Sequence, residues 1–148
     1  MLAENPDQRR DLVEHRDLVP NAVEEVLRFE APSPVQARYV MTDVEHHGRT
    51  VPEGSALLLL NGSANRDERR YPDGDRFDIR RPATGHLSFG QGVHFCLGAA
   101  LARLEGRVAL EVIRERLPNL HLAPGFTMEY VPSFFFRQPA RLDILWDT

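Results

Sequence analysis

The sequence has 148 residues, of which 42% are apolar and 27% are charged, and its formal net charge is −4. This composition is typical of a globular protein with a hydrophobic core, and it contains neither the roughly 20-residue apolar stretch of a membrane span nor an export leader. The acidic balance without a basic block argues against nucleic-acid binding, and a single cysteine favours a reduced thiol in the cytoplasm.

The first part of the chain is predicted to form helices followed by short strands. Residues 7–29 have a helical pattern that is broken near Val19-Pro20-Asn21, where Asn21 is placed to cap the second helix. Prolines at 32 and 34 end this helix. Short strands are expected next, at residues 38–41, 44–46 and 50–51. The apolar run 56–60 fits either a buried strand or the start of a helix.

The second part is predicted to contain a long ordered connection, a long helix and a C-terminal pair of hairpins. Residues 61–85 are rich in turn formers and charges, and they exceed the length of an ordinary loop. Residues 97–117 form the clearest helical pattern, with apolar side chains at steps of three and four. Gly106 interrupts that pattern at a cost of about 1 kcal/mol relative to alanine. Pro118 ends the helix, and the remainder contains turns and the aromatic run 134–136.

The only cysteine lies in the segment 89–98, FGQGVHFCLG, just before the predicted long helix. The free N–H groups and the dipole of a helix start favour negative charge, here the Cys96 thiolate. Gly90, Gly92 and Gly98 allow sharp turns and a close approach of the backbone to a large flat ligand. Backbone N–H groups beside a thiolate tune the bond between its sulfur and a metal, as in haem proteins with a cysteine ligand. The alternative is a buried structural cysteine.

Charged residues outside this segment suit two further arrangements. Glu25 and Arg28 are three residues apart on a predicted helix and share one face, and Arg76 follows in the turn-rich connection. One carboxylate and two guanidinium groups can join the helix to that connection through charge-assisted hydrogen bonds. Arg38 and His94 are suited to binding the carboxylates of a ligand.

These motifs, in this order, resemble the C-terminal part of a bacterial cytochrome P-450. The matching motifs are F-G-x-G-x-H-x-C-x-G at 89–98, E-x-x-R at 25–28, and Arg76-Phe77 in a proline-containing segment. Further segments that fit the same bacterial subgroup are residues 18–25, 63–67 and 99–105. The resemblance covers essentially all 148 residues. It implies a mainly α fold with small β-sheets (α+β), in which the cysteine loop leads into a long helix.

The resemblance also implies roles for individual residues. Cys96 would be the catalytic thiolate ligand of iron in haem b, and Arg38 and His94 would pair with the haem propionates. The residues implied to contact the cofactor are Arg38, Phe89, Gly90, His94, Cys96 and Gly98. The structural triad of the family would consist of Glu25, Arg28 and Arg76. The substrate pocket would include Val35, Ser133, Phe134 and Phe135, with Pro34 and Gln36 nearby.

The family implies a monooxygenase that inserts one oxygen atom of dioxygen into an organic substrate, here expected to be apolar. Electrons would come from a partner such as a ferredoxin with its reductase, and neither nucleic acid nor a membrane is expected as a partner. Family members are usually much longer, and this sequence has no counterpart of their long distal helix. We therefore expect residues 1–148 to be the haem-ligating C-terminal portion, with little monooxygenase activity alone. Its exposed apolar surface would favour oligomers.

Other interpretations remain open at the level of sequence. The chain could bind, store or sense haem without oxygen chemistry, or it could be a family remnant that assists another protein without haem. A nucleophilic Cys96 paired with His94 lacks an evident third orienting group, and zinc would find few suitably spaced ligands. Arg103 and Arg107 could form a docking patch for an acidic iron–sulfur partner.

Overall fold

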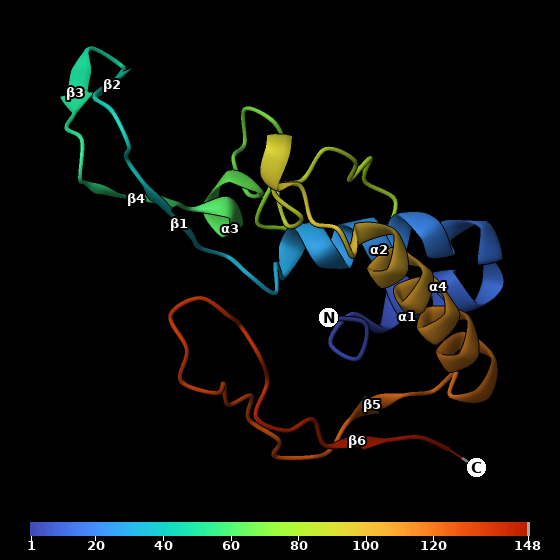
Figure 1. The fold of residues 1–148 in the computed structure, drawn as a ribbon. Helices are drawn as coiled ribbons and strands as arrows, with labels where there is room; N and C mark the ends of the chain where they lie inside the picture. Colours follow the sequence, from blue (N-terminus) through green and yellow to red (C-terminus); the bar gives the residue numbers. More distant parts are fainter. Residues whose placement is uncertain (148) are drawn as a thin grey trace.

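The computed structural model describes residues 1–147, and its longer helices gather at one side of the molecule (Figure 1). Helix α1 (Pro6–Glu14), the 3₁₀ turn η1 (Arg16–Leu18) and helix α2 (Val19–Phe29) follow one another. Helix α4 (Ala99–Arg116) packs against α1 and α2. The buried apolar core joins these helices to the long connection, and it consists of Leu12, Val19, Ala22, Phe77 and Ile79.

The break between the first two helices lies at His15–Leu18, not at the predicted Val19-Pro20-Asn21. Pro20 is tolerated because it lies in the first turn of α2, where backbone N–H groups have no partner within the helix. The predicted Asn21 cap is wrong. The Asn21 side-chain amide instead donates hydrogen bonds to the carbonyl oxygens of Ile79 and Arg81, at 2.6 and 2.7 Å. Asn21 therefore attaches the connection to α2.

The predicted strands are present, the first of them two residues earlier than expected, and they form part of two antiparallel ladders that extend away from the helices (Figure 1). Strand β1 (Gln36–Tyr39) pairs with β4 (Ala56–Leu59), so the ambiguous apolar run is a strand. Between them, β2 (Val44–His46) pairs with β3 (Arg49–Val51). The turn contains His47 and Gly48 at φ of 49° and 71°, a left-handed conformation suited to a tight hairpin turn.

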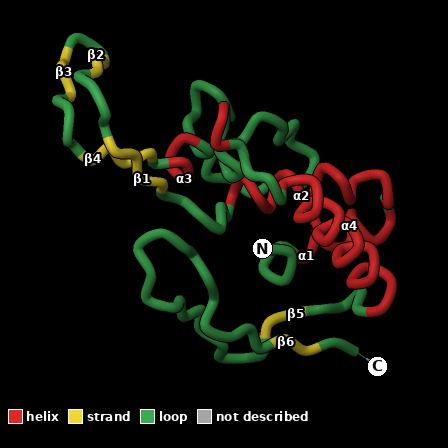
Figure 2. The backbone as a smooth tube through the Cα atoms, in the orientation of Figure 1, coloured by secondary structure: helices red, strands yellow, loops and turns green. Residues whose placement is uncertain are grey.

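Much of the remaining chain is ordered loop, as Figure 2 shows. The short helix α3 (Asn61–Ala64) starts the connection, and the 3₁₀ turn η2 (Gly92–His94) lies in the cysteine loop. In the connection, a Cβ atom on Gly74 would lie 2.3 Å from the Arg66 carbonyl oxygen, so only glycine fits. Residues 61–85 are thus held by close backbone contacts, as expected of an ordered segment.

The C-terminal part forms one long hairpin instead of the predicted pair. Strands β5 (His121–Leu122) and β6 (Ile144–Leu145) pair antiparallel at its base. A second bridge joins Tyr130 to Pro139 nearer the tip. Prolines and the aromatic run interrupt regular pairing between these points.

Long helices together with small two-stranded sheets confirm the predicted α+β class. The glycine at position 106 allows α4 to pack closely on α2, because a Cβ atom there would lie 3.0 Å from Val23 Cγ1. Within residues 1–147, none of the helices combines the length and the apolar character needed to cross a membrane.

Candidate functional site

The cysteine loop is shaped by backbone hydrogen bonds and two left-handed glycines. Gly90 and Gly92 have φ angles of 69° and 73°, which disfavour any residue with a side chain. The Phe95 N–H donates to the Gly92 carbonyl at 3.0 Å, and the Cys96 N–H donates to the Phe89 carbonyl at 2.9 Å. These bonds turn the chain back on itself just before α4 begins at Ala99. The loop therefore has a defined shape in the protein alone.

The side chains at the front of this loop are exposed. Cys96 is a free, exposed cysteine, and its neighbours Val93 and Leu97 are 98% and 102% exposed. A buried structural cysteine is therefore excluded. A thiol surrounded by exposed apolar side chains suits a ligand that is apolar and can bind sulfur.

Strand β1 lies beside the cysteine loop and brings Arg38 near it. A Cβ atom on Gly90 would lie 3.6 Å from Gln36 Nε2, and Arg38 donates a 3.2 Å hydrogen bond to Gln36 Oε1. A Cβ atom on Gly98 would lie 3.9 Å from the sulfur of Cys96. The predicted cofactor residues on β1 and in the loop thus lie on adjacent segments, and His94 in this loop is exposed.

Glu25 and Arg28 form a fully buried ion pair on α2, with side chains that are both 0% exposed. Arg28 Nε and Nη2 donate to the two Glu25 carboxylate oxygens at 2.7 and 2.8 Å. Arg28 also donates to the carbonyl oxygens of Asn65, Gly74 and Arg76, at 2.7 to 3.2 Å. The pair therefore attaches the connection to α2.

The third predicted member, Arg76, does not join this cluster through its side chain. Its residue is exposed, and its contribution is the backbone carbonyl that accepts from Arg28. The arginine facing Glu25 is Arg81, whose Nε lies 3.5 Å from Glu25 Oε1 and whose side chain is 10% exposed. The placement of Arg76 in the triad is thus corrected. The chain turns between Asp78 and Arg81, where the Arg81 N–H donates to the Asp78 carbonyl at 3.0 Å, and the Arg81 side chain then lies beside Glu25.

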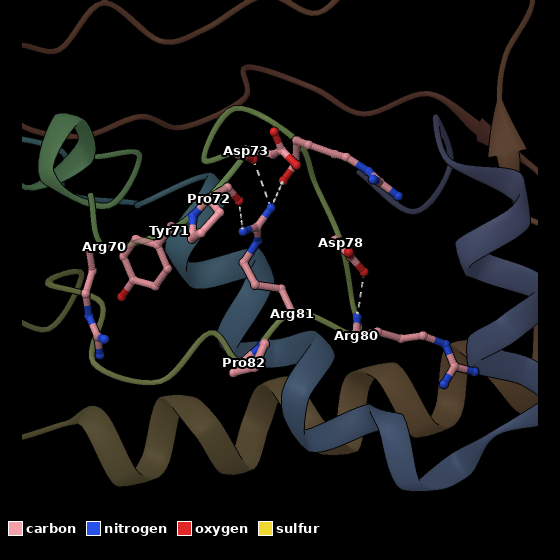
Figure 3. A pocket seen from close by; sticks show the side chains of 9 residues that line it. Arg70, Tyr71, Pro72, Asp73, Asp78, Arg80, Arg81 and Pro82 are labelled. Atoms are coloured by element: carbon pink, nitrogen blue, oxygen red, sulfur yellow. Dashed lines mark hydrogen bonds between the residues drawn. The ribbon is translucent and has the colours of Figure 1, made fainter. Parts of the chain in front are cut away.

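The connection lines a pocket of about 470 Å³, and Figure 3 shows how its lining side chains lie. Its arginine-rich lining consists of Arg70, Tyr71, Pro72, Asp73, Arg76, Asp78, Arg80, Arg81 and Pro82. Arg81 donates to the carbonyl oxygens of Pro72 and Asp73, while Arg80 makes a two-bond ion pair with Asp11 of α1. These arginines serve to hold the connection in place, and Cys96 does not line this pocket.

A second charged cluster, not predicted from the sequence, lies behind Phe89. Arg103 of α4 donates to both carboxylate oxygens of Glu24 on α2, at 2.7 and 3.0 Å. His86 Nε2 lies 3.2 Å from Glu24 Oε2, and the His86 side chain is 1% exposed. Arg103 is therefore engaged within the protein and is not free for the predicted docking patch, whereas Arg107 is exposed.

The pKa values in this cluster follow from burial and from the opposed charges. Burial alone would raise the pKa of Glu24, but the hydrogen bond and charge of Arg103, with His86, hold it below its usual value. Burial lowers the pKa of His86, an effect that Glu24 opposes and that the charges of Arg103 and Arg28 reinforce. The hydrogen bond to Glu24 raises the pKa of Arg103. The cluster thus favours a carboxylate, a guanidinium and a neutral imidazole.

Asn65 and Ser88 complete the support of this segment. The Asn65 side chain donates to Ser88 Oγ at 2.8 Å and accepts from the Leu87 N–H at 2.6 Å. Ser88 Oγ donates to the Leu27 carbonyl on α2 at 2.6 Å. The sequence offered one signal for this network, the polar residues His86 and Ser88 directly before Phe89.

The residues predicted to line a substrate pocket lie on two segments. Val35 is half-buried just before β1, and the hairpin-tip residues Ser133, Phe134 and Phe135 are exposed. The C-terminal hairpin is attached near the end of α2, where the Arg137 N–H donates to the Pro32 carbonyl at 2.9 Å. The structure thus places an exposed aromatic tip on a segment held next to the one that leads into β1.

No group of three or more histidine, cysteine, aspartate or glutamate side chains suited to a metal ion lies among residues 1–147. The described side chains therefore do not provide a multi-ligand zinc centre. A metal at this loop would need Cys96 together with ligand atoms that a cofactor brings.

Comparisons with known proteins agree with the motifs. The family described as Cytochrome P450 matches residues 3–117. A 6-deoxyerythronolide B hydroxylase of Saccharopolyspora erythraea is 47% identical over 122 residues, which are 82% of this chain and 30% of the relative. Cytochrome P450 monooxygenase PikC of Streptomyces venezuelae is 42% identical over 148 residues, covering 98% of this chain and 35% of the relative.

A solved structure shows the same likeness in three dimensions. Cytochrome P450 CREJ superimposes with a TM-score of 0.94 at 39% identity, covering 99% of this chain and 37% of that protein. The chain thus spans about a third of the length of the curated relatives it matches. On these matches and on the cysteine-loop geometry, the chain belongs to the cytochrome P450 family.

Proposed function

We propose that residues 1–148 are the C-terminal, haem-ligating portion of a haem-thiolate monooxygenase. The observation that carries the proposal is the exposed sulfur of Cys96, held in a preformed glycine loop and surrounded by exposed apolar side chains. The residues present fit haem b, because a soft thiolate ligand and an apolar surface occur together. A structural cysteine would need neither feature.

Each residue would have a defined task toward the cofactor. Cys96 would supply the thiolate, and its backbone N–H, bonded to Phe89, limits the orientation of the loop. Arg38 and His94 would bind the two propionates, Arg38 from β1 and His94 from the loop. Gly90 and Gly98 keep the surface beside β1 and the sulfur free of side chains. Haem with a thiolate ligand supplies the activation of dioxygen.

The reaction implied by the family would place one oxygen atom of dioxygen in an organic substrate, while the other leaves as water. Electrons would come from a redox partner such as a ferredoxin with its reductase, and protons from solvent. The exposed aromatic tip at Phe134 and Phe135, with Val35, would contact an apolar substrate. The free, exposed thiol suits a reducing cytoplasm.

A second candidate is haem binding without monooxygenase activity in the 148-residue chain alone. The observation that favours it is the near-complete exposure of Val93 and Leu97, since nothing in residues 1–147 covers the front of the loop. The apolar stripe of α4 is exposed as well, and it consists of Leu101, Leu104, Val108 and Val112. We propose that this stripe makes contact with further polypeptide or with a second copy of the chain.

An absorption spectrum of the reduced chain with haem and carbon monoxide tests the ligand assignment. We expect the red-shifted band of a thiolate complex in the wild type and its loss in Cys96→Ser, with His121→Ala as a control on a distant segment. An identical spectrum for wild type and Cys96→Ser would refute the role of Cys96. Substrate oxidation by the loaded chain with a ferredoxin pair would then separate the two candidate functions.

A further inference from the structure

The Glu24–Arg103 ion pair is stacked on the aromatic ring that flanks the cysteine loop. The guanidinium carbon of Arg103 lies 4.7 Å from the ring centre of Phe89, while two of its nitrogens bind the Glu24 carboxylate. A guanidinium is planar, so it can bind a carboxylate at its edge and an aromatic ring at its face at once. Both contacts are attractive, and together they fix the position of the ring.

His86 also lies next to the Phe89 ring. Its imidazole lies 5.8 Å from the Phe89 ring centre. Its Nδ1 accepts the Ser88 N–H at 3.2 Å, which leaves Nε2 to carry the proton and to donate to Glu24. Because the side chain is 1% exposed, water does not replace these bonds. Glu24 thus connects the two residues, His86 and Arg103, whose side chains lie next to the Phe89 ring.

Phe89 connects this cluster to Cys96 through its backbone. Its carbonyl oxygen accepts the Cys96 N–H at 2.9 Å, and its ring lies 6.4 Å from that of Phe95. Gly90, which follows, has the left-handed φ of 69° and permits backbone motions that other residues resist. Restraint of the Phe89 ring therefore also restrains the acceptor of the Cys96 N–H.

We propose that Glu24, His86 and Arg103 form a positioning unit that acts on the cysteine loop through Phe89. None of the three belongs to the loop. They set the direction of the Phe89 carbonyl and, with it, the hydrogen bond to Cys96. Toward haem, the inference rests on the proposed function, because a fixed N–H donor and a fixed ring would hold the sulfur in one orientation for iron.

Hydrogen exchange in the chain without haem tests the positioning step directly. We expect Arg103→Gln to accelerate exchange of the Cys96 amide about tenfold, and Arg103→Lys less, because lysine keeps the charge but loses the planar group. The Val40 amide, which bonds to the Ser55 carbonyl just past the end of β1, should be unchanged. Arg107→Gln, on an exposed part of the same helix, is the matched control.

Two results would overturn the inference. One is Cys96 exchange in Arg103→Gln equal to that in the control. The other is equal acceleration at Cys96 and Val40, which indicates general loss of stability and no specific restraint. If Arg103→Gln does not fold, Glu24→Gln provides the same comparison, because it removes the charge that orients Arg103 while keeping a partner for His86.

The spectrum with haem and carbon monoxide separates this inference from the proposed function. We expect Arg103→Gln to convert part of the thiolate band into the band of a weaker or protonated ligand, with partial rescue in Arg103→Lys. The proposed function alone would be rejected if the wild type lacks the thiolate band while Arg103→Gln still accelerates exchange of the Cys96 amide. A thiolate band that is the same in all variants, with unchanged exchange, would reject the positioning unit alone.

Discussion

Replacement of Arg28 by lysine should destabilise the protein strongly although the positive charge is kept. The guanidinium makes five hydrogen bonds, two to Glu25 and one each to the carbonyl oxygens of Asn65, Gly74 and Arg76. An ammonium group has three donors, so at least two of these five acceptors lose their hydrogen bond to residue 28. At about 1.5–3 kcal/mol for each hydrogen bond to a charged group, the unfolding free energy should fall by about 3 kcal/mol or more.

Urea denaturation followed by circular dichroism measures this loss. A loss of about 3 kcal/mol is large against the 5–15 kcal/mol of total stability typical of a domain, so the midpoint should move clearly to lower urea. Arg10→Lys is the control, because Arg10 and Asp7 form an ion pair with side chains 63% and 89% exposed, and it should change stability by less than about 0.5 kcal/mol. Equal midpoints for Arg28→Lys and Arg10→Lys would refute the reasoning.

The remaining predictions concern pH and association. The pKa of His86 is lowered from 6.5 by burial, so the unfolded chain binds the proton first. The contribution of His86 to stability is therefore complete above about pH 6.5 and is lost as the pH falls toward the folded-state pKa. The urea midpoint of the wild type should fall as the pH is lowered below about 6.5, and it should fall less steeply in His86→Asn. Equal dependence of the midpoint on pH in the two proteins would contradict this role of His86. The double change Leu101→Glu and Leu104→Glu should shift the chain toward monomer in sedimentation velocity, because both side chains lie on the exposed stripe of α4. A wild-type chain that is already monomeric would reject association through this stripe.

Local features of the sequence predicted most elements, whereas contacts between distant segments explain the errors. Turn residues and short extended pieces predict the β2–β3 hairpin, whose pairing is set by a short local turn. The strand character of residues 56–59 was left open, because their partner β1 lies about 20 residues earlier in the chain. The capping role predicted for Asn21 was wrong because its hydrogen-bond partners, Ile79 and Arg81, lie 58 and 60 residues away in the sequence. The turns of the cysteine loop were predictable, since Gly90 and Gly92 adopt the positive φ angles that glycine permits.

The charged clusters also depend on contacts between distant segments, which sequence spacing does not reveal. The stretch 76–81, RFDIRR, contains several arginines, and spacing alone does not determine which of them reaches α2. The path of the backbone determines which arginine does so: the Arg76 carbonyl accepts from Arg28, while the Arg81 side chain lies against Glu25. His86 was missed for a related reason, since Glu24 lies 62 residues before it.

The cysteine loop is supported from behind and open in front, and this division has a consequence for ligand binding. The polar contacts next to the start of the loop come from α2, α4 and the connection, through Glu24, Arg103 and Asn65. The exposed side of the loop carries apolar side chains such as Val93 and Leu97 together with Cys96. A flat apolar ligand would therefore meet a loop that is already ordered, so that little conformational entropy is lost on binding. Affinity should then depend mainly on the sulfur bond and on the apolar area covered, while the residues behind the loop determine how precisely the sulfur is placed.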